Sequence, residues 1–114
     1  RQCCRGLFLA AWRGRRLEGY MITCLRGGRE GAAAELVSVA VDPSSRQGGA
    51  ASALLESTLR RLRRRGVRRI HLIVRVHNAA ALAFYRKYGF RRLRVVRRYY
   101  EDGGDGIAMT RLVS

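Results

Sequence analysis

The spacing of hydrophobic residues changes from a strand pattern to a helix pattern midway through the chain. Three short apolar runs are separated by polar or glycine-containing segments, which is typical of strands joined by turns. These runs cover residues 7–12, 17–25 and 35–41. Over residues 49–65 the hydrophobic positions instead recur every three or four residues, which predicts one face of a helix. The first half therefore predicts a hairpin, a third strand that ends before Pro43, and a helix.

The second half returns to strands around one short helix. Residues 70–76 form a nearly continuous apolar run, which predicts a strand buried on both faces. Asn78 can cap a helix over residues 79–88, and Gly89 can end it. Two further strands are expected over residues 90–99 and 106–112. A strand, a helix and a strand in succession imply a right-handed parallel crossover. We therefore expect one α/β (α+β) domain over residues 1–114, with a mixed central sheet.

Composition limits the class of protein but does not identify a partner. The net charge is +16, and all 24 basic residues except Lys87 are arginine. One explanation is attraction of nucleic acid or another polyanion. The other, which we favour, is a genome rich in G and C that fills neutral surface positions with arginine. On this basis direct nucleic-acid binding is not expected.

Membrane and metal partners are not expected either. No apolar run approaches the roughly 20 residues of a membrane helix, so we expect a soluble cytoplasmic protein. The three cysteines, Cys3, Cys4 and Cys24, lack the spacing of zinc ligands and are expected to be free thiols. No metal cofactor is predicted.

The turn before the first helix is the most informative feature. Gly48, Gly49, Ala50 and Ala51 have almost no side chains, so a ligand can approach their backbone N–H groups. The positive end of the helix dipole lies behind those groups. This combination suits a diphosphate.

Three segments in order resemble the GCN5-related N-acetyltransferase (GNAT) family. They are residues 35–43 (ELVSVAVDP), the Arg46-x-x-Gly49-x-Ala51 loop, and residues 78–90 (NAAALAFYRKYGF). The resemblance implies transfer of an acetyl group from acetyl-CoA to an amine. It implies pantetheine contacts from the strand and from Asn78, and pyrophosphate contacts from the turn. The strand residues are Val39, Ala40 and Val41, and the turn residues are Arg46, Gln47, Gly48, Gly49, Ala50, Ala51 and Ser52.

The resemblance also suggests a general acid and a general base. Tyr85 occupies the family's position for the acid that protonates the departing thiolate, although it can also be read as a core aromatic residue. Glu35 is the candidate base, because the Ala-Glu-Leu run resembles the strand of histone-type members. The equal alternative is a carboxylate paired with one of the many arginines. Related enzymes commonly have glutamate or histidine where this chain has Ile73, and His71 on the same strand face is a possible substitute.

The C-terminal segment points to the acceptor. Residues 97–109 resemble the hairpin of RimI-type and archaeal protein N-terminal acetyltransferases, which makes Tyr99 and Tyr100 candidate substrate contacts. The expected acceptor is a protein or peptide N-terminus, with ribosomal proteins among the candidates. The alternatives are a small-molecule amine acetyltransferase and a degenerate domain that binds RNA or the ribosome. The family's first strand and two helices are expected to be missing before Leu7, which would leave the acceptor groove incomplete.

Overall fold

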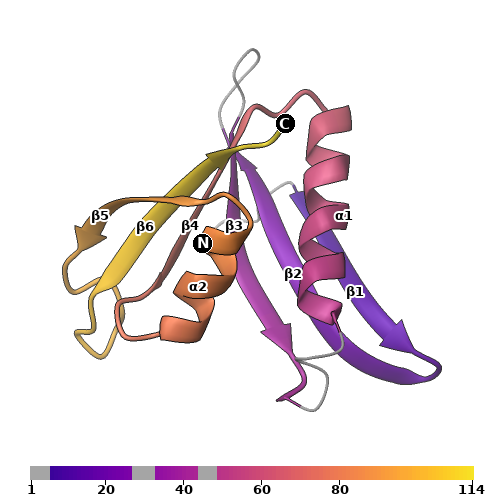
Figure 1. Cartoon of the computed structure of the whole chain (residues 1–114), viewed down its shortest axis with the longest axis horizontal. Helices are drawn as coiled ribbons and strands as arrows, with labels where there is room; N and C mark the ends of the chain where they lie inside the picture. Colours follow the sequence, from indigo (N-terminus) through magenta and orange to yellow (C-terminus); the bar gives the residue numbers. More distant parts are fainter. Residues whose placement is uncertain (1–5, 27–32, 44–48) are drawn as a thin grey trace.

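A six-stranded sheet with two helices forms the molecule in the computed structural model, which describes residues 6–26, 33–43 and 49–114 (Figure 1). The strands are β1 (Gly6–Arg13), β2 (Arg16–Arg26), β3 (Ala33–Val41), β4 (Arg69–Arg75), β5 (Arg91–Val96) and β6 (Gly106–Leu112). The helices are α1 (Ala50–Arg64) and α2 (Ala79–Lys87). Each predicted element is present, and the largest difference is that β5 ends at Val96 rather than at residue 99.

The sheet contains one parallel pair among antiparallel neighbours. The strand order is β1-β2-β3-β4-β6-β5. Strands β3 and β4 run parallel and are connected through α1, while the other four neighbouring pairs are antiparallel. The mixed sheet with a single parallel crossover is therefore confirmed.

The parallel pair is short, and this divides the sheet. Pairing between β3 and β4 covers only three positions, from Ala33 opposite Arg69 to Glu35 opposite His71. Beyond them the two strands diverge, as the V-shaped gap between β3 and β4 shows in Figure 1. The register between β2 and β3 also shifts between Ile22 and Thr23, so Val37 has no partner on β2. A shift of this kind bends a strand and increases its twist.

Local chemistry accounts for the helix ends. Asn78 caps α2 as predicted, because its side-chain oxygen accepts a hydrogen bond from the backbone N–H of Ala81 at 3.1 Å. Gly66 (φ 78°) and Gly89 (φ 89°) follow the two helices in the left-handed conformation that ends many helices. Neither of the two helices in the described ranges is long and apolar enough to cross a membrane.

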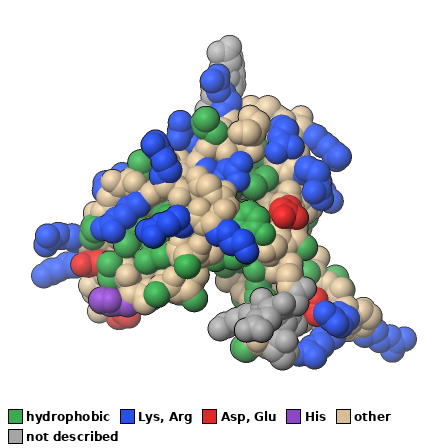
Figure 2. Space-filling model, in the orientation of Figure 1, with side chains coloured by type: hydrophobic (Ala, Val, Ile, Leu, Met, Phe, Trp, Pro, Cys, Tyr) green, Lys and Arg blue, Asp and Glu red, His purple; other side chains and the backbone are tan. Residues whose placement is uncertain are grey.

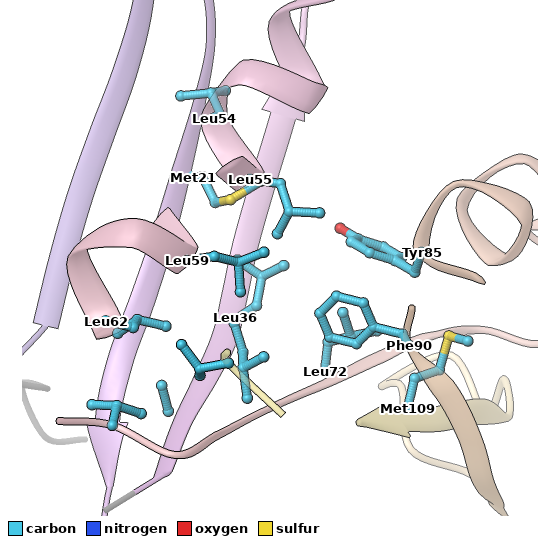
Figure 3. Packing of buried hydrophobic residues seen from close by; sticks show 14 of the residues in the cluster. Met21, Leu36, Leu54, Leu55, Leu59, Leu62, Leu72, Tyr85, Phe90 and Met109 are labelled. Carbon is cyan, nitrogen blue, oxygen red and sulfur yellow. The ribbon is translucent and has the colours of Figure 1, made fainter. Parts of the chain in front are cut away.

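Both helices cover the same face of the sheet and enclose the core. Leu55 and Leu62 of α1 are completely buried, as are Ile70 of β4 and Met109 of β6. Tyr85 of α2 and Phe90 extend this cluster toward the second helix (Figure 3). Full burial of one such aliphatic side chain contributes about 2 kcal/mol. The helices are therefore held by their apolar stripes, and the space between them is set by side-chain size.

The opposite face of the sheet is more exposed, which contradicts one expectation. In β4 the buried residues Ile70 and Leu72 alternate with half-buried His71 and Ile73, so this strand is not buried on both faces. On the same face Phe8 and Trp12 of β1 are 65% and 61% exposed. No helix of the described residues covers these side chains, and this explains the alternation.

The expectation of three free thiols is wrong for Cys24. This residue of β2 is buried at 4% exposure and disulfide-bonded. The other two cysteines, Cys3 and Cys4, lie outside the described residues. Sequence spacing cannot reveal a bond of this kind, because it depends on which strand ends the fold brings together.

Candidate functional site

A hollow of about 550 Å³ opens between the two helices at the edge of β3. Most of its walls are small or apolar, and hydrophobic side chains are visible between the helices in Figure 2. The lining residues are Val39, Ala40, Val41, Ala51, Asn78, Ala80, Ala81, Phe84 and Tyr85. Six of these residues were predicted from the sequence to bind cofactor or to catalyse. The structure therefore brings together the candidate acid and candidate cofactor contacts from several elements, although these residues lie far apart in the chain.

The β3 wall offers a free strand edge. Val39, Ala40 and Val41 pair on one side with Met21, Tyr20 and Gly19 of β2. On the other side, pairing with β4 has already ended at Glu35. The backbone amides and carbonyls of this edge are therefore accessible to an extended ligand, which can pair with them as another strand would.

The start of α1 forms a second wall. Gly49 is the N-cap residue (φ 86°, ψ 6°), provides no side-chain cap, and precedes a first turn without acidic residues. Among the residues that the structure describes, no atom lies within 4 Å of a Cβ added at Gly49, so none of them blocks the approach to this residue. Of the predicted residues at this helix start, Ala51 lines the hollow, whereas Gly49 and the buried Ala50 line a separate hollow beside β1 and Ser52 lines neither. The predicted pyrophosphate residues Arg46, Gln47 and Gly48 lie outside the described residues.

Asn78 lies at the start of the other helix. Its side-chain oxygen caps α2 through the N–H of Ala81, so this oxygen is already engaged. The side-chain nitrogen remains as the hydrogen-bond donor that a ligand in the hollow can use. The small residues Ala80 and Ala81, which sequence reasoning did not single out, complete this wall. The run of three alanines after Asn78 was the available signal, because it leaves the first turn of α2 without bulk.

Tyr85 lines the hollow from α2. Its ring is 4% exposed and packs edge-on against Phe84 and Phe90, with centroids 5.2 and 5.4 Å away. The hydroxyl points from the ring toward Leu55, into the space between the helices (Figure 3). Burial raises the pKa of Tyr85 to about 12. A phenol with this pKa stays protonated at neutral pH, so it can donate a proton or hydrogen bond but cannot act as a base.

Glu35 is not among the residues that line this hollow. It lies at the point where β3 and β4 separate, opposite His71. Its carboxylate accepts hydrogen bonds from Arg26 at 2.9 and 3.2 Å. The alternative interpretation of Glu35, a carboxylate paired with an arginine, is thus confirmed, and the role as base stays a prediction.

Ile73 and His71 lie on the same face of β4, two residues apart. Ile73 packs closely over Gly106. A Cβ added at Gly106 would lie only 2.5 Å from Cγ2 of Ile73. An aliphatic side chain in this place can position a substrate but cannot accept a proton. Neither residue lines the hollow that Tyr85 closes.

The hairpin between β5 and β6 is fastened to β4 by Arg75. The Arg75 guanidinium lies 4.0 Å from the ring centroid of Tyr100 and 3.1 Å from the Asp102 carboxylate. Tyr99 in turn contacts Tyr100 edge-on at 4.9 Å. Burial is the main cause that raises the pKa of Tyr100, and hydrogen bonds from Gly104 and Arg75 lower the pKa of Asp102. Sequence reasoning missed Arg75, because nothing in the local pattern shows that β4 faces this turn.

Comparisons with known proteins agree on one family. A model described as the acetyltransferase (GNAT) family matches residues 1–90. The [ribosomal protein bS18]-alanine N-acetyltransferase of Escherichia coli K12 is 43% identical over 84 residues, which cover 71% of this chain and 57% of that protein. An N-alpha-acetyltransferase of Saccharolobus solfataricus is 38% identical over 77 residues, covering 67% of this chain and 46% of that protein. The chain thus spans about half the length of the curated relatives it matches.

A solved structure extends the likeness to almost the whole chain. The crystal structure of the ribosomal-protein-S18-alanine N-acetyltransferase from Escherichia coli superposes with a TM-score of 0.84 and 34% identity. The superposition covers 99% of this chain and 72% of that one. The overall arrangement of the sheet and the two helices is therefore also found in a solved protein.

Proposed function

The chain belongs to the GNAT acetyltransferase family, and from this we propose that it transfers the acetyl group of acetyl-CoA to the α-amino group at a protein or peptide N-terminus. The observation that carries the proposal is the hollow of about 550 Å³ between the helices. There the free edge of β3, Ala51 on the first turn of α1 and the Tyr85 side chain line one space.

The residues present fit acetyl-CoA in two ways. The edge of β3 over Val39, Ala40 and Val41 provides backbone partners for the amides of a pantetheine arm. The start of α1 provides backbone N–H groups and a positive dipole for the pyrophosphate. We extend this phosphate site to residues 46–48 on the resemblance alone. In the described part of the chain, no group of three or more candidate ligands is placed to hold a metal ion.

The chemistry assigns a proton donor and a proton acceptor. The neutral amine nitrogen attacks the thioester carbonyl carbon, the carbon–sulfur bond breaks, and the sulfur leaves as a thiolate. Tyr85 donates its hydroxyl proton to that sulfur. The amine gives up a proton to a base. The base then passes a proton through water to the ionised Tyr85, which becomes neutral again. No net proton is left on the protein.

We propose Glu35 as this base, acting from the point where β3 and β4 separate. An α-amino group has a pKa of about 8, so most of the acceptor amine is protonated at neutral pH and must lose a proton before its nitrogen can attack. Glu35→Gln should lower kcat/KM at pH 7 by about 100-fold, because the amide cannot accept the proton. Steady-state kinetics with a peptide acceptor measure this.

Arg26→Gln is the matched control, because it breaks the same ion pair from the other side. Its kcat/KM should stay within about threefold of the unsubstituted chain, since surface ion pairs contribute only about 0–1 kcal/mol. Equal decreases in the two variants would show that the ion pair, and not proton transfer, is what matters at this place.

The acceptor proposal rests on the relatives and on the hairpin. The curated relatives act on ribosomal protein bS18 alanine or are named N-alpha-acetyltransferases. We propose that Tyr99 and Tyr100, held by Arg75, contact the first residues of the acceptor peptide. We also propose that the acceptor groove is completed by elements outside these 114 residues, next to the exposed Phe8 and Trp12.

Acetyl-CoA should stabilise the folded protein. A ligand at 100 times its Kd adds about 2.7 kcal/mol to the free energy of unfolding, which for a domain of this size corresponds to a rise in Tm of about 10 °C. Thermal unfolding with and without acetyl-CoA measures this shift. Release of CoA in the presence of N-terminal peptides, compared with polyamines and aminoglycosides, then identifies the acceptor class.

ATP is the control for this experiment, because it has phosphates but no pantetheine arm. A chain of net charge +16 binds polyanions weakly through charge alone, so ATP should give a much smaller shift. The proposal fails if millimolar acetyl-CoA produces no shift, or only the shift that ATP produces.

A further inference from the structure

A second hollow, of about 510 Å³, lies at the end of β6 and the start of β5 and is surrounded by arginine. Its lining residues are Arg69, Gly89, Arg91, Arg111, Leu112 and Ser114. None of them lines the hollow proposed for acetyl-CoA. Three guanidinium groups thus come from three different strands to one place, which the sequence alone did not indicate.

Two of the three guanidinium groups are held in place. Arg111 donates from Nε to the carbonyl of Leu112 at 2.6 Å and from Nη1 to the carbonyl of Tyr88 at 2.7 Å. Arg69 donates from Nη1 to the hydroxyl of Thr110 at 3.4 Å. Groups that are already positioned lose less side-chain entropy when they bind a ligand.

No carboxylate compensates this charge in the part of the chain that the structure describes. The ion pairs found there join Glu18, Glu35, Asp42 and Asp102 to other arginines. Arg69, Arg91 and Arg111 take part in none of them. A genome-wide bias toward arginine explains many isolated arginines, but it does not explain three around one hollow, two of them held by hydrogen bonds. The arrangement favours an anionic ligand.

The positive surface continues from the hollow along the outer strand. Arg91, Arg92 and Arg94 belong to β5, Arg97 and Arg98 follow it, and all five are exposed. By register, Arg91 and Arg94 share one face of the sheet, because they lie opposite Thr110 and Ala108 of β6. Figure 2 shows basic side chains gathered over this side of the molecule. The six residues of β5 span roughly 20 Å, which is far longer than a single phosphate group.

We propose that the hollow and the β5 edge, together called the arginine track (Arg69, Arg91, Arg94, Arg97, Arg98 and Arg111), bind the phosphate backbone of a single-stranded nucleic acid. Guanidinium groups match phosphate in planar, bidentate geometry. A row of them along one strand edge suits a ligand that carries a phosphate at regular intervals. This site is independent of the proposed acetyl transfer.

The test compares two double variants of equal charge. Fluorescence anisotropy measures the Kd of a labelled 12-nucleotide oligouridylate, with any affinity tag at the N-terminus because Ser114 lines the hollow. Arg69→Gln with Arg91→Gln should weaken binding at least tenfold at 0.1 M salt. The slope of log K against log salt should fall by about 1.4, or about 0.7 for each phosphate that is no longer neutralised. Arg60→Gln with Arg64→Gln on α1 removes the same charge from exposed positions off the track and should change Kd less than threefold.

Three further binding measurements locate the site and identify the class of ligand. Arg94→Gln with Arg97→Gln removes only exposed side chains, so it should also weaken binding without affecting the fold. Saturating acetyl-CoA should leave the oligonucleotide bound, since its proposed site shares no lining residue with the hollow. A deoxyribonucleotide of equal length should bind similarly, because backbone contacts are sequence-independent.

Three results would overturn the proposal. Equal decreases in affinity in the track and α1 variants would mean that only net charge matters. Poly-glutamate displacing the oligonucleotide at the same charge concentration would mean that the surface prefers an acidic protein. Displacement by acetyl-CoA would mean that the nucleic acid had bound at the other hollow.

Discussion

Tyr85→Phe should lower kcat by about 100-fold or more while the Kd for acetyl-CoA stays unchanged. The hydroxyl is the only group removed, and it is the group that we propose protonates the leaving sulfur in the hollow that Tyr85 lines. The ring remains, so its packing against Phe84 and Phe90 remains. Single-turnover release of CoA gives the chemical rate, and calorimetry gives the Kd.

Tyr88→Phe is the matched control on the same helix end. It makes the identical chemical change in a residue that does not line the hollow. Its kcat should stay within about twofold of the unsubstituted chain. An unchanged rate in Tyr85→Phe, or equal decreases in both variants, would remove Tyr85 from the mechanism.

The free energy of unfolding at high pH, compared between the unsubstituted chain and Tyr85→Phe, provides a second readout. The folded pKa of Tyr85, about 12, lies above its ordinary value of 10, so the neutral hydroxyl is favoured by folding. This difference in pKa contributes about 3 kcal/mol to the free energy of unfolding below pH 10, and the contribution is lost as the pH rises from 10 to 12. Tyr85→Phe does not carry this dependence, and its unfolding free energy should fall less over the same range. Denaturant unfolding at several pH values measures the difference.

Ala51→Phe should weaken acetyl-CoA binding by about 100-fold, or about 2.8 kcal/mol. Ala51 lies on the first turn of α1 and lines the hollow between the helices. A benzyl group there occupies the space that the proposed pyrophosphate and pantetheine arm need. Because the position faces a hollow rather than the packed core, the unfolding free energy should change by less than about 1.5 kcal/mol. Calorimetric titration and denaturant unfolding measure the two quantities.

Ala53→Phe provides the comparison two residues along. It makes the same substitution on the same helix, but Ala53 is exposed and lines a separate hollow beside β1. Its Kd for acetyl-CoA should therefore stay within about threefold of the unsubstituted chain. If Ala51→Phe binds acetyl-CoA as tightly as Ala53→Phe does, the cofactor lies elsewhere and the proposed site is wrong.

The hydrophobic pattern and a few local signals were enough to predict every element of the fold. The spacing of Leu55, Leu59 and Leu62 predicted α1, and these residues are buried in it. Asn78 and Gly89 predicted the ends of α2 correctly, since capping depends on neighbours within a few residues. The small residues at Gly49 and Ala50 marked the start of α1 correctly, and Gly49 is its N-cap without a side-chain hydrogen bond.

The site was predictable only in part, because its parts meet through contacts between distant segments. Sequence reasoning placed Val39, Ala51, Asn78 and Tyr85 in one site, and all four line one hollow. It did not show that Glu35 pairs with Arg26, because that ion pair depends on the register between β2 and β3.

What the sequence by itself determined is local: where strands and helices begin and end, and which residues are small, charged or aromatic. Periods of two and of about 3.6 residues encode these features within short windows. The tertiary structure alone decided that β3 and β4 separate after three pairs, that Arg75 holds the hairpin, and that Arg69, Arg91 and Arg111 share a hollow. Each of these depends on strand order and register, which are set by packing between residues far apart in the chain.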